Sequence, residues 1–318
     1  MESNEIINWL LEGDVSIQYQ VHRDLLLIER KDLQDRISEE GFGAKFLSKR
    51  KSDGNWGVKF YQPKWTSTHY TLLDLRNLCI APDIPLIKES INIILKNEKA
   101  NDGGILPIGI ERLSDLCING MFLNYATYFG TNEQDLESVV DCILAQIMPD
   151  GGFNCRSNRD QTIHSSLHTT ISVLEGITEY EMNGYKYRLA ELRQAKNSSV
   201  EFILKHRLFL SDRTGEIINK GFLKLTYPFR WRYDILRALD YFQCAKVKWD
   251  DRMIPAIQVL QKKRNKDSTW NAQSKHPGQV HLEMEKAGKP SRWNTMRALR
   301  VIQYYKIEHS SANTAYKS

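Results

Sequence analysis

An acid and a thiol lie two residues apart in the stretch RLSDLCINGM, at residues 112–121. Asp115 and Cys117 could both bind a metal ion, because carboxylates and thiolates are ligands of Zn²⁺. Residues two apart in a regular helix point about 200° away from each other, so both side chains could reach one metal only where the chain is still turning into the helix. The structural alternative is that Asp115 caps a helix and that Cys117 is a small buried hydrophobe.

The composition of the whole chain is that of an ordinary globular protein. Of its 318 residues, 41% are hydrophobic and 26% are charged, which suffices for a substantial core. The 44 basic and 39 acidic residues are spread along the chain and give a net charge of +5, so we expect no nucleic-acid partner. The sequence has no basic leader and no window of about 18 apolar residues, so we expect no transmembrane segment.

The cysteines indicate a reducing compartment. Their number is odd, and none of them forms a CxxC pair. Because disulfide frameworks pair their cysteines, this pattern predicts reduced thiols and a cytoplasmic protein. The five positions are Cys79, Cys117, Cys142, Cys155 and Cys244.

A turn signal recurs along the chain at intervals of roughly 50 to 60 residues. The stretches are DGNWG at 53–57, DGGIL at 102–106, DGGFN at 150–154, RTGEI at 213–217 and DSTWN at 267–271. Glycine reaches positive φ without a steric penalty, which favours tight turns at these places. The repetition indicates a fold made of similar units.

Each turn signal is followed by an apolar segment with helical spacing, and these segments alternate with more polar helices. The apolar segments cover 67–80, 113–129, 165–180, 230–242 and 292–305, and a sixth, without a turn signal, covers 16–29. The more polar ones include 85–97, 134–148 and 252–262, where apolar residues recur every three or four positions. Such an alternation predicts inner helices paired with outer helices that bury one face.

Six such pairs predict an all-α fold, an (α/α)6 toroid or barrel of six helical hairpins. An open solenoid is the structural alternative, but closure of the ring hides both exposed ends. We predict one toroid domain over residues 1–306 and a disordered tail over 307–318. The segment GFLKLTYPF at 221–229 is the one candidate strand, and we interpret it as a loop.

The repeats resemble those of a known superfamily. DGNWG and DGGFN, each followed by an inner helix, look like the repeat shared by squalene and hopene cyclases and by the β subunits of protein prenyltransferases. The opening GDVSIQYQVHRDLL looks like a stretch of the cyclase-like branch. The resemblance covers residues 13 to 305 and implies the α/α toroid of the terpenoid cyclases. It does not imply one activity, because one fold hosts many sites.

A class II terpene cyclase is disfavoured by the absence of its acid motif. The resemblance to cyclases implies a DxDD motif that protonates an alkene or epoxide, and the sequence has none. WDDR at 249–252 has adjacent acids, but it falls in an expected outer helix, where we interpret it as a solvated charged face.

The resemblance to prenyltransferases implies a zinc site. In that family the ligands are Asp-x-Cys at the start of one inner helix and a His in the next, and the matching residues here are Asp115, Cys117 and His168. His164, one turn earlier, is an alternative ligand or a partner of the ligand. Three protein ligands leave a fourth position for a water or a substrate thiol, whose pKa the metal would lower. The structural alternative is that His168 is a satisfied core histidine.

This chain departs from the prenyltransferase pattern at three points. Ile118 follows Cys117, where the family has an aromatic residue. Arg112 matches one basic residue expected for a lipid diphosphate, whereas Gly109 stands where another is expected, although diphosphates favour several converging cations. The companion α subunit of the family, a helical-hairpin repeat, has no counterpart in this chain.

A toroid has a central cavity, and we expect the leading ends of the inner helices to line its mouth. Aromatic side chains there could hold an isoprenoid or stabilise a carbocation. The alternative is that the Arg-Trp pairs before the inner helices are packing contacts. The candidate rim residues are Trp65, His69, Arg112, Arg230, Trp231, Tyr233, Asp234, Arg292 and Trp293.

Two hypotheses of function follow. The first is a prenyltransferase-like, zinc-dependent transferase that activates a thiol or water beside an apolar, isoprenoid-like substrate. The second is a non-catalytic toroid, or pseudoenzyme, that binds a peptide or lipid in its cavity. The zinc content of the purified protein distinguishes the two hypotheses.

Overall fold

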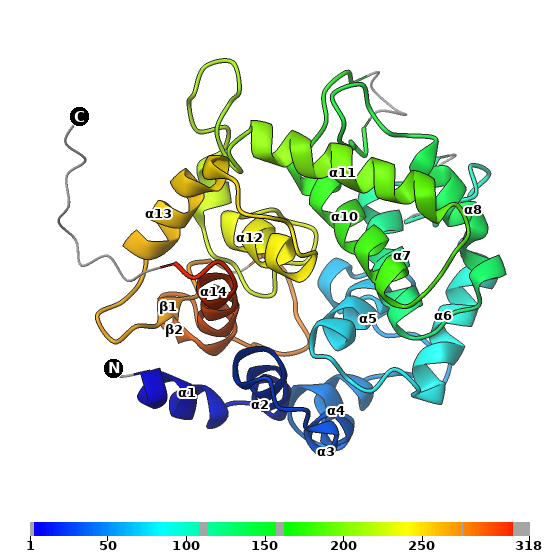
Figure 1. The fold of residues 1–318 in the computed structure, drawn as a ribbon. Coiled ribbons are helices and arrows are strands. Elements are labelled where there is room, and N and C mark those ends of the chain that lie inside the picture. Colours follow the sequence, from blue (N-terminus) through cyan, green and yellow to red (C-terminus); the bar gives the residue numbers. More distant parts are fainter. Residues whose placement is uncertain (1–2, 108–112, 157–161, 275, 308–318) are drawn as a thin grey trace.

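Helices arranged in a ring make up the fold of the computed structural model (Figure 1). The structure describes residues 3–107, 113–156, 162–274 and 276–307. Inner helices surround the centre, and further helices lie outside them. This arrangement places the inner helices around a common space.

The inner helices follow the apolar segments of the sequence. Most of their side chains are buried on all sides, which explains why these segments lack a polar face. They are α2 (Val15–Val21), continued by the π-helical turn η1 (His22–Leu26), then α5 (Thr68–Asn77), α7 (Leu116–Tyr128), α10 (Leu167–Met182), α12 (Ile235–Cys244) and α14 (Arg292–Tyr304).

The outer helices are amphipathic and cover the ring. In α6 (Pro85–Asn97), for example, Ile87, Ile91 and Ile94 are buried, and Pro85 occupies the first turn, where its missing N–H costs nothing. The others are α1 (Ser3–Leu11), α3 (Lys31–Arg36), α4 (Gly41–Leu47), α8 (Glu133–Leu144), α11 (Leu189–Lys205) and α13 (Ile254–Lys262).

Short elements fill the connections. Three are 3₁₀ turns, η2 (Lys64–Thr66), η3 (Lys220–Leu223) and η4 (Asp251–Met253). The strands β1 (Trp270–Asn271) and β2 (Pro290–Ser291) form an antiparallel pair in which Trp270 faces Ser291. The candidate strand at 221–229 is a 3₁₀ turn followed by loop, as expected.

Two glycines allow α7 and α10 to lie in close contact. An added methyl group at Gly120 would lie 2.6 Å from the backbone of Ser172, and one at Gly176 would lie 2.4 Å from the carbonyl oxygen of Gly120. Both distances are shorter than van der Waals contact, so no larger residue fits without moving a helix. The two helices carry the predicted zinc ligands at their leading ends and cavity residues at their trailing ends.

The first and last parts of the chain meet and close the ring. Arg292 at the start of α14 donates from Nε to the carbonyl oxygen of Trp9 at 2.9 Å, and its guanidinium lies 4.6 Å from the indole ring of Trp9. Farther along α14, Arg300 pairs with Asp24 of η1 at 2.7 Å. These contacts join α14 to both α1 and η1.

The fold agrees with the expected helix-rich ring. The exact count of six hairpins stays a prediction, because the first unit is built from several short helices rather than one simple pair. Residues 308–318, most of the predicted tail, lie outside the described residues, and so does Arg112.

Candidate functional site

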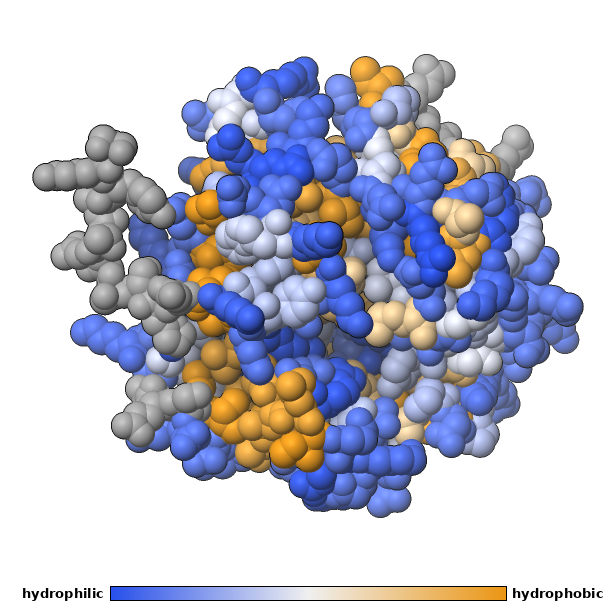
Figure 2. Space-filling model, viewed as in Figure 1, coloured by the Kyte–Doolittle hydropathy of each residue, from blue (hydrophilic) through white to orange (hydrophobic). Residues whose placement is uncertain are grey.

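A cavity of about 420 Å³ lies at the centre of the ring. Residues from the trailing halves of α2 with η1, α5, α7 and α10 line it, together with residues along α12 and the first two-thirds of α14. The space-filling view shows the molecule hollowed near the centre of this face (Figure 2). The volume suits a small molecule.

Charged side chains make up much of the cavity wall. The five arginines outnumber the four carboxylates by one, so the wall carries an excess of positive charge. The arginines are Arg23, Arg76, Arg237, Arg297 and Arg300, and the carboxylates are Asp24, Glu175, Glu179 and Asp240.

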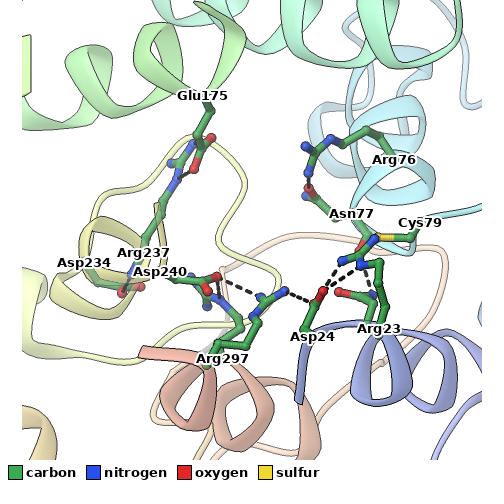
Figure 3. A network of polar contacts seen from close by, with 12 residues as sticks. Arg23, Asp24, Arg76, Asn77, Cys79, Glu175, Asp234, Arg237, Asp240 and Arg297 are labelled. Atoms are coloured by element: carbon green, nitrogen blue, oxygen red, sulfur yellow. Dashed lines mark hydrogen bonds and ion pairs between the residues drawn. The ribbon is translucent and has the colours of Figure 1, made fainter. Parts of the chain in front are cut away.

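A chain of ion pairs links three inner elements across one side of the cavity (Figure 3). Asp24 accepts from Arg23 at 2.6 Å and from Arg300 at 2.7 Å. Asp240 accepts from Arg297 at 2.9 Å and from Arg300 at 3.0 Å, both through Oδ2. Burial opposes ionisation of Asp24, but Arg300 and Arg23 hold its pKa below the ordinary value.

A second group of charges surrounds the ring of Phe229. The guanidinium groups of Arg237 and Arg297 lie 4.5 Å and 4.8 Å from the centre of this ring. Arg237 also binds both oxygens of Glu175, at 2.8 Å and 2.6 Å. The paired carboxylate and the aromatic face fix the direction of the guanidinium plane.

Aromatic rings supply the apolar part of the wall. Tyr227 and Trp293 stack with ring centres 4.8 Å apart and an angle of 10° between the planes. Arg76 of α5 pairs with Glu179 of α10 and lies 5.6 Å from the ring of Tyr128. The cavity therefore combines cations, anions and flat apolar surfaces.

Several polar atoms of the wall have no partner within the described residues. The donors are Nη1 of Arg297, Nε of Arg300 and Nε of Arg76. The acceptors are Oδ1 of Asn124 and Oδ1 of Asp240. Buried polar groups are normally satisfied by protein or water, so unpartnered donors and acceptors around one cavity indicate a place for a polar ligand.

Sequence reasoning missed these residues, although a signal was present. The tripeptide Arg-Ala-Leu occurs at 237–239 and again at 297–299, each time inside an apolar inner segment. An arginine is rarely buried unless it is paired. Charged residues inside the inner segments therefore pointed to the cavity more directly than the aromatic residues at their starts.

A second cluster lies at the leading end of α7. Asp115 precedes this helix in an extended conformation, with φ −86° and ψ 121°, and its side chain makes no capping hydrogen bond. Cys155, in the loop after α8, accepts at its Sγ from the backbone N–H of Cys117 at 3.0 Å. The contact with Cys155, burial and the charge of Asp115 raise the pKa of Cys117, whereas the contact with Cys117 lowers the pKa of Cys155 despite burial and the charge of Asp115. Asp115, Cys117 and Cys155 are thus neighbours.

His168 lies at the start of α10, and its ring is held by other partners. Its Nδ1 accepts from the backbone N–H of Tyr233 at 2.8 Å, and its ring contacts those of Phe222 and Trp231 at 5.2 Å and 5.0 Å. Burial and the nearby Arg237 and Arg232 lower its pKa to about 4. The imidazole is therefore neutral at neutral pH, and because Nδ1 accepts, Nε2 carries the ring proton and has no free lone pair for a metal in this arrangement.

The predicted zinc set is not assembled in this structure. Among the described residues, no group of three or more His, Cys, Asp or Glu side chains is placed to hold a metal ion. The alternative ligand His164 contacts Asn154 through its backbone oxygen. Zinc binding by Asp115, Cys117 and His168 stays a prediction.

The described rim candidates other than Trp293 are not among the lining residues of the central cavity. His69 is fully buried, with its Nδ1 3.2 Å from the hydroxyl oxygen of Tyr125, and burial lowers its pKa to about 3. Arg230 lies 4.7 Å from the ring of Trp65 and pairs with Asp74 at 3.8 Å. These contacts match the packing alternative.

The candidates before α12 also make structural contacts. Asp234 caps this helix by accepting from the backbone N–H of Arg237 at 2.8 Å. The hydroxyl of Tyr233 donates to the carbonyl oxygen of Leu208 at 2.6 Å. The ring of Trp231 packs against His168, and Arg292 packs on Trp9 in the ring closure.

Comparison with sequence families and curated proteins gives no match. Within the described residues, none of the helices is both long and apolar enough to cross a membrane.

Solved structures with the same architecture exist. A polysaccharide lyase superposes with a TM-score of 0.52 at 10% identity, covering 97% of this chain and 99% of its own. A glycosyl hydrolase family 88 protein from Bacteroides vulgatus superposes with a TM-score of 0.51 at 10% identity, covering 95% and 97%. The chain has an α/α toroid fold. A type II terpene cyclase from Scytonema reaches a TM-score of 0.34 at 12% identity. A relation to prenyltransferases in particular stays a prediction.

Proposed function

We propose that the central cavity of this toroid binds a small hydroxylated organic acid, such as a uronic acid or a short sugar chain that contains one. The observation that carries the proposal is Arg297. Its side chain is only 3% exposed, it pairs with Asp240 through Nε, and its Nη1 has no partner although the residue lines the cavity. A carboxylate ligand would satisfy this donor.

The unpartnered atoms also favour hydroxyl groups on the ligand. The unpartnered donors on Arg297, Arg300 and Arg76 favour a negatively charged ligand. The unpartnered acceptors on Asn124 and Asp240 require a ligand that donates hydrogen bonds. An isoprenoid diphosphate offers acceptors only, while a sugar acid offers a carboxylate and several hydroxyl donors. The stacked rings of Tyr227 and Trp293 provide an apolar wall for the flat face of a sugar.

The structural neighbours are consistent with this ligand class. The two solved structures with TM-scores of 0.52 and 0.51 are named as a polysaccharide lyase and a glycosyl hydrolase, classes of protein that act on carbohydrates. At 10% identity they support the fold alone, so the proposal rests on the cavity wall. In this account the chain is an enzyme-like toroid whose bound sugar acid is the substrate.

A zinc-dependent transferase is a second candidate. The specific observation in its favour is the extended backbone at Asp115, which is the turn that an Asp-x-Cys metal site requires before a helix begins. The substrate would then be a thiol or water beside an isoprenoid-like group. Stoichiometric zinc that is lost in Cys117→Ala, and retained in Cys142→Ala, would support it. The absence of zinc from the purified wild-type protein would contradict it.

Calorimetric titration with a panel of ligands tests the first proposal. The panel contains glucuronate, a glucuronate-containing oligosaccharide, glucose, farnesyl diphosphate and a short neutral peptide. We expect the two uronates to bind and their affinity to fall with added salt, because the attraction is between charges, and glucose to bind more weakly. Binding of farnesyl diphosphate or the peptide without binding of a uronate would overturn the proposal. The oligosaccharide is also assayed for cleavage.

A further inference from the structure

Cys117 and Cys155 form a contact pair away from the central cavity. Cys117 lies in the first turn of α7, and Cys155 lies in the loop between α8 and α10. The sulfur of Cys155 lies 3.0 Å from the backbone nitrogen of Cys117, so the two side chains are neighbours. Both residues are partly exposed.

Two groups hold the sulfur of Cys155 in place. It accepts from the backbone N–H of Cys117 at 3.0 Å and from the hydroxyl of Thr169 at 3.3 Å. The backbone N–H of Cys155 in turn donates to the same hydroxyl oxygen at 3.3 Å. These contacts fix the sulfur against the start of α7, where the helix leaves N–H groups without partners of their own.

The other cysteines have different surroundings. The sulfur of Cys142 contacts Ser114 Oγ at 3.4 Å and Gln146 Nε2 at 3.2 Å. The sulfur of Cys79 accepts from Arg23 at 3.5 Å. Cys244 lies on α12 in the wall of the cavity. In the part of the chain that the structure describes, none of these three side chains hydrogen-bonds to another cysteine residue.

We propose that Cys117 and Cys155 are a redox-active thiol pair that peroxide converts reversibly to a disulfide. One S–S bond forms, and the two S–H bonds break. The two sulfurs lose two electrons and two protons, and hydrogen peroxide takes them up as its O–O bond breaks, which yields two molecules of water. A dithiol reductant reverses the reaction by exchange.

The disulfide would join the first turn of α7 to the loop after α8. Cross-linking removes conformational freedom from the unfolded chain and stabilises the folded state when the native geometry accommodates the bond. The pair shares Cys117 with the predicted zinc set, so a metal bound there would have to leave first. The test is therefore made on chelator-treated, fully reduced protein.

The experiment counts thiols and maps the bond in the full chain. The reduced protein has five free cysteines. After mild hydrogen peroxide, we expect two thiols to be lost, a Cys117–Cys155 disulfide to appear in peptide mass spectra, and both thiols to return with dithiothreitol. The melting temperature should rise on oxidation and fall again on reduction.

Serine variants separate this pair from general oxidation. Cys155→Ser and Cys117→Ser should each abolish the disulfide and the rise in melting temperature, whereas Cys142→Ser should retain both. The wild-type measurement decides the question even if a variant fails to fold. Five thiols that survive in oxidised, folded wild-type protein would overturn the proposal. So would a disulfide between other cysteines, or oxidation that stops at separate sulfinic acids.

Discussion

Arg237 and Arg297 each begin an Arg-Ala-Leu tripeptide and lie near the same aromatic ring, that of Phe229. Each also pairs with a carboxylate, Glu175 or Asp240. Burying a guanidinium costs free energy unless it is paired. A paired arginine that still holds an unused donor, as Arg297 does at Nη1, is therefore better explained by a ligand than by stability alone.

Single residues were the hardest part of the site to predict from sequence. Asp115 and Cys117 were recognised by type and spacing, and the structure places them beside a third residue, Cys155, that no motif indicated. Arg297 was passed over because only the three-dimensional structure shows its Nη1 in a cavity wall. A sequence gives residue type but not which polar atom lacks a partner.

His69 gives a prediction about pH at the scale of one residue. Burial lowers its pKa to about 3, from 6.5 in the unfolded chain, so the unfolded state binds more protons between these values. Its contribution to stability is fully present above pH 6.5 and is lost as the pH falls toward 3. His69→Phe keeps a ring among its aromatic neighbours but removes the titration.

We expect His69→Phe to make the free energy of unfolding depend less on pH under acidic conditions. Between pH 6.5 and pH 4, the wild type should lose more free energy of unfolding than the variant, by at least about 1 kcal/mol, the value of a shift of about one pKa unit. Urea denaturation at several pH values measures this, and the exposed His164→Gln serves as the control. Parallel curves for wild type and His69→Phe would refute the assignment.

At the scale of elements, α7 and α10 come into close contact at Gly120 and Gly176. A methyl group at Gly176 would press on the Gly120 carbonyl at 2.4 Å and push the helices apart. Overpacking of this kind costs about 1–3 kcal/mol, occasionally more. We expect Gly176→Ala to lower the free energy of unfolding by about 1–3 kcal/mol or more, as measured by urea titration.

A matched glycine provides the control for this prediction. Gly221 lies in the exposed turn η3 with an ordinary φ, and its nearest neighbour for an added methyl group is the side chain of Asn219 at 3.0 Å. Gly221→Ala should change stability by less than about 0.5 kcal/mol, as exposed substitutions usually do. Equal effects at Gly176 and Gly221 would show that the close approach of α7 and α10 contributes little.

The helices were predicted more accurately than the position of the cavity within the ring. The pattern at 85–97 matches α6, because a strong 3.6-residue period and an N-terminal proline mark its length. The cavity was expected at the leading ends of the inner helices, but in α5, α7 and α10 its lining comes from their trailing halves, and only Trp293 of the rim candidates takes part. Contacts such as Arg230 on Trp65 fill part of the leading end, and sequence periodicity carries no information about such packing between distant segments.

At the scale of the whole molecule, the contact between Arg292 and Trp9 is a test of closure. Arg292→Ala removes the hydrogen bond to the Trp9 carbonyl and the cation–π contact with its ring. Together these contributions are about 1–2 kcal/mol. Thermal and urea unfolding should show this loss. Arg193→Ala, which removes an exposed pair with Glu181, should cost less than about 1 kcal/mol.

A different result at Arg292 would be informative about the ring. If Arg292→Ala and Arg193→Ala lower stability equally, the contact of α14 with α1 adds nothing beyond an ordinary surface interaction.

The fold class itself was predictable because the turn signals repeat and each unit pairs an apolar with an amphipathic helix. The ligand was not, because its chemistry depends on side chains from six different helices.

The most direct test of the central claim is a calorimetric titration of glucuronate into wild-type protein and Arg297→Lys. Lysine keeps the charge but loses the planar fork that can hold Asp240 and a ligand together. We predict an affinity about tenfold lower for Arg297→Lys, and no change for the surface control Arg252→Lys, whose partners are Glu201 and Asp250. Equal affinities in the wild type and Arg297→Lys, or no binding to either, would contradict the account.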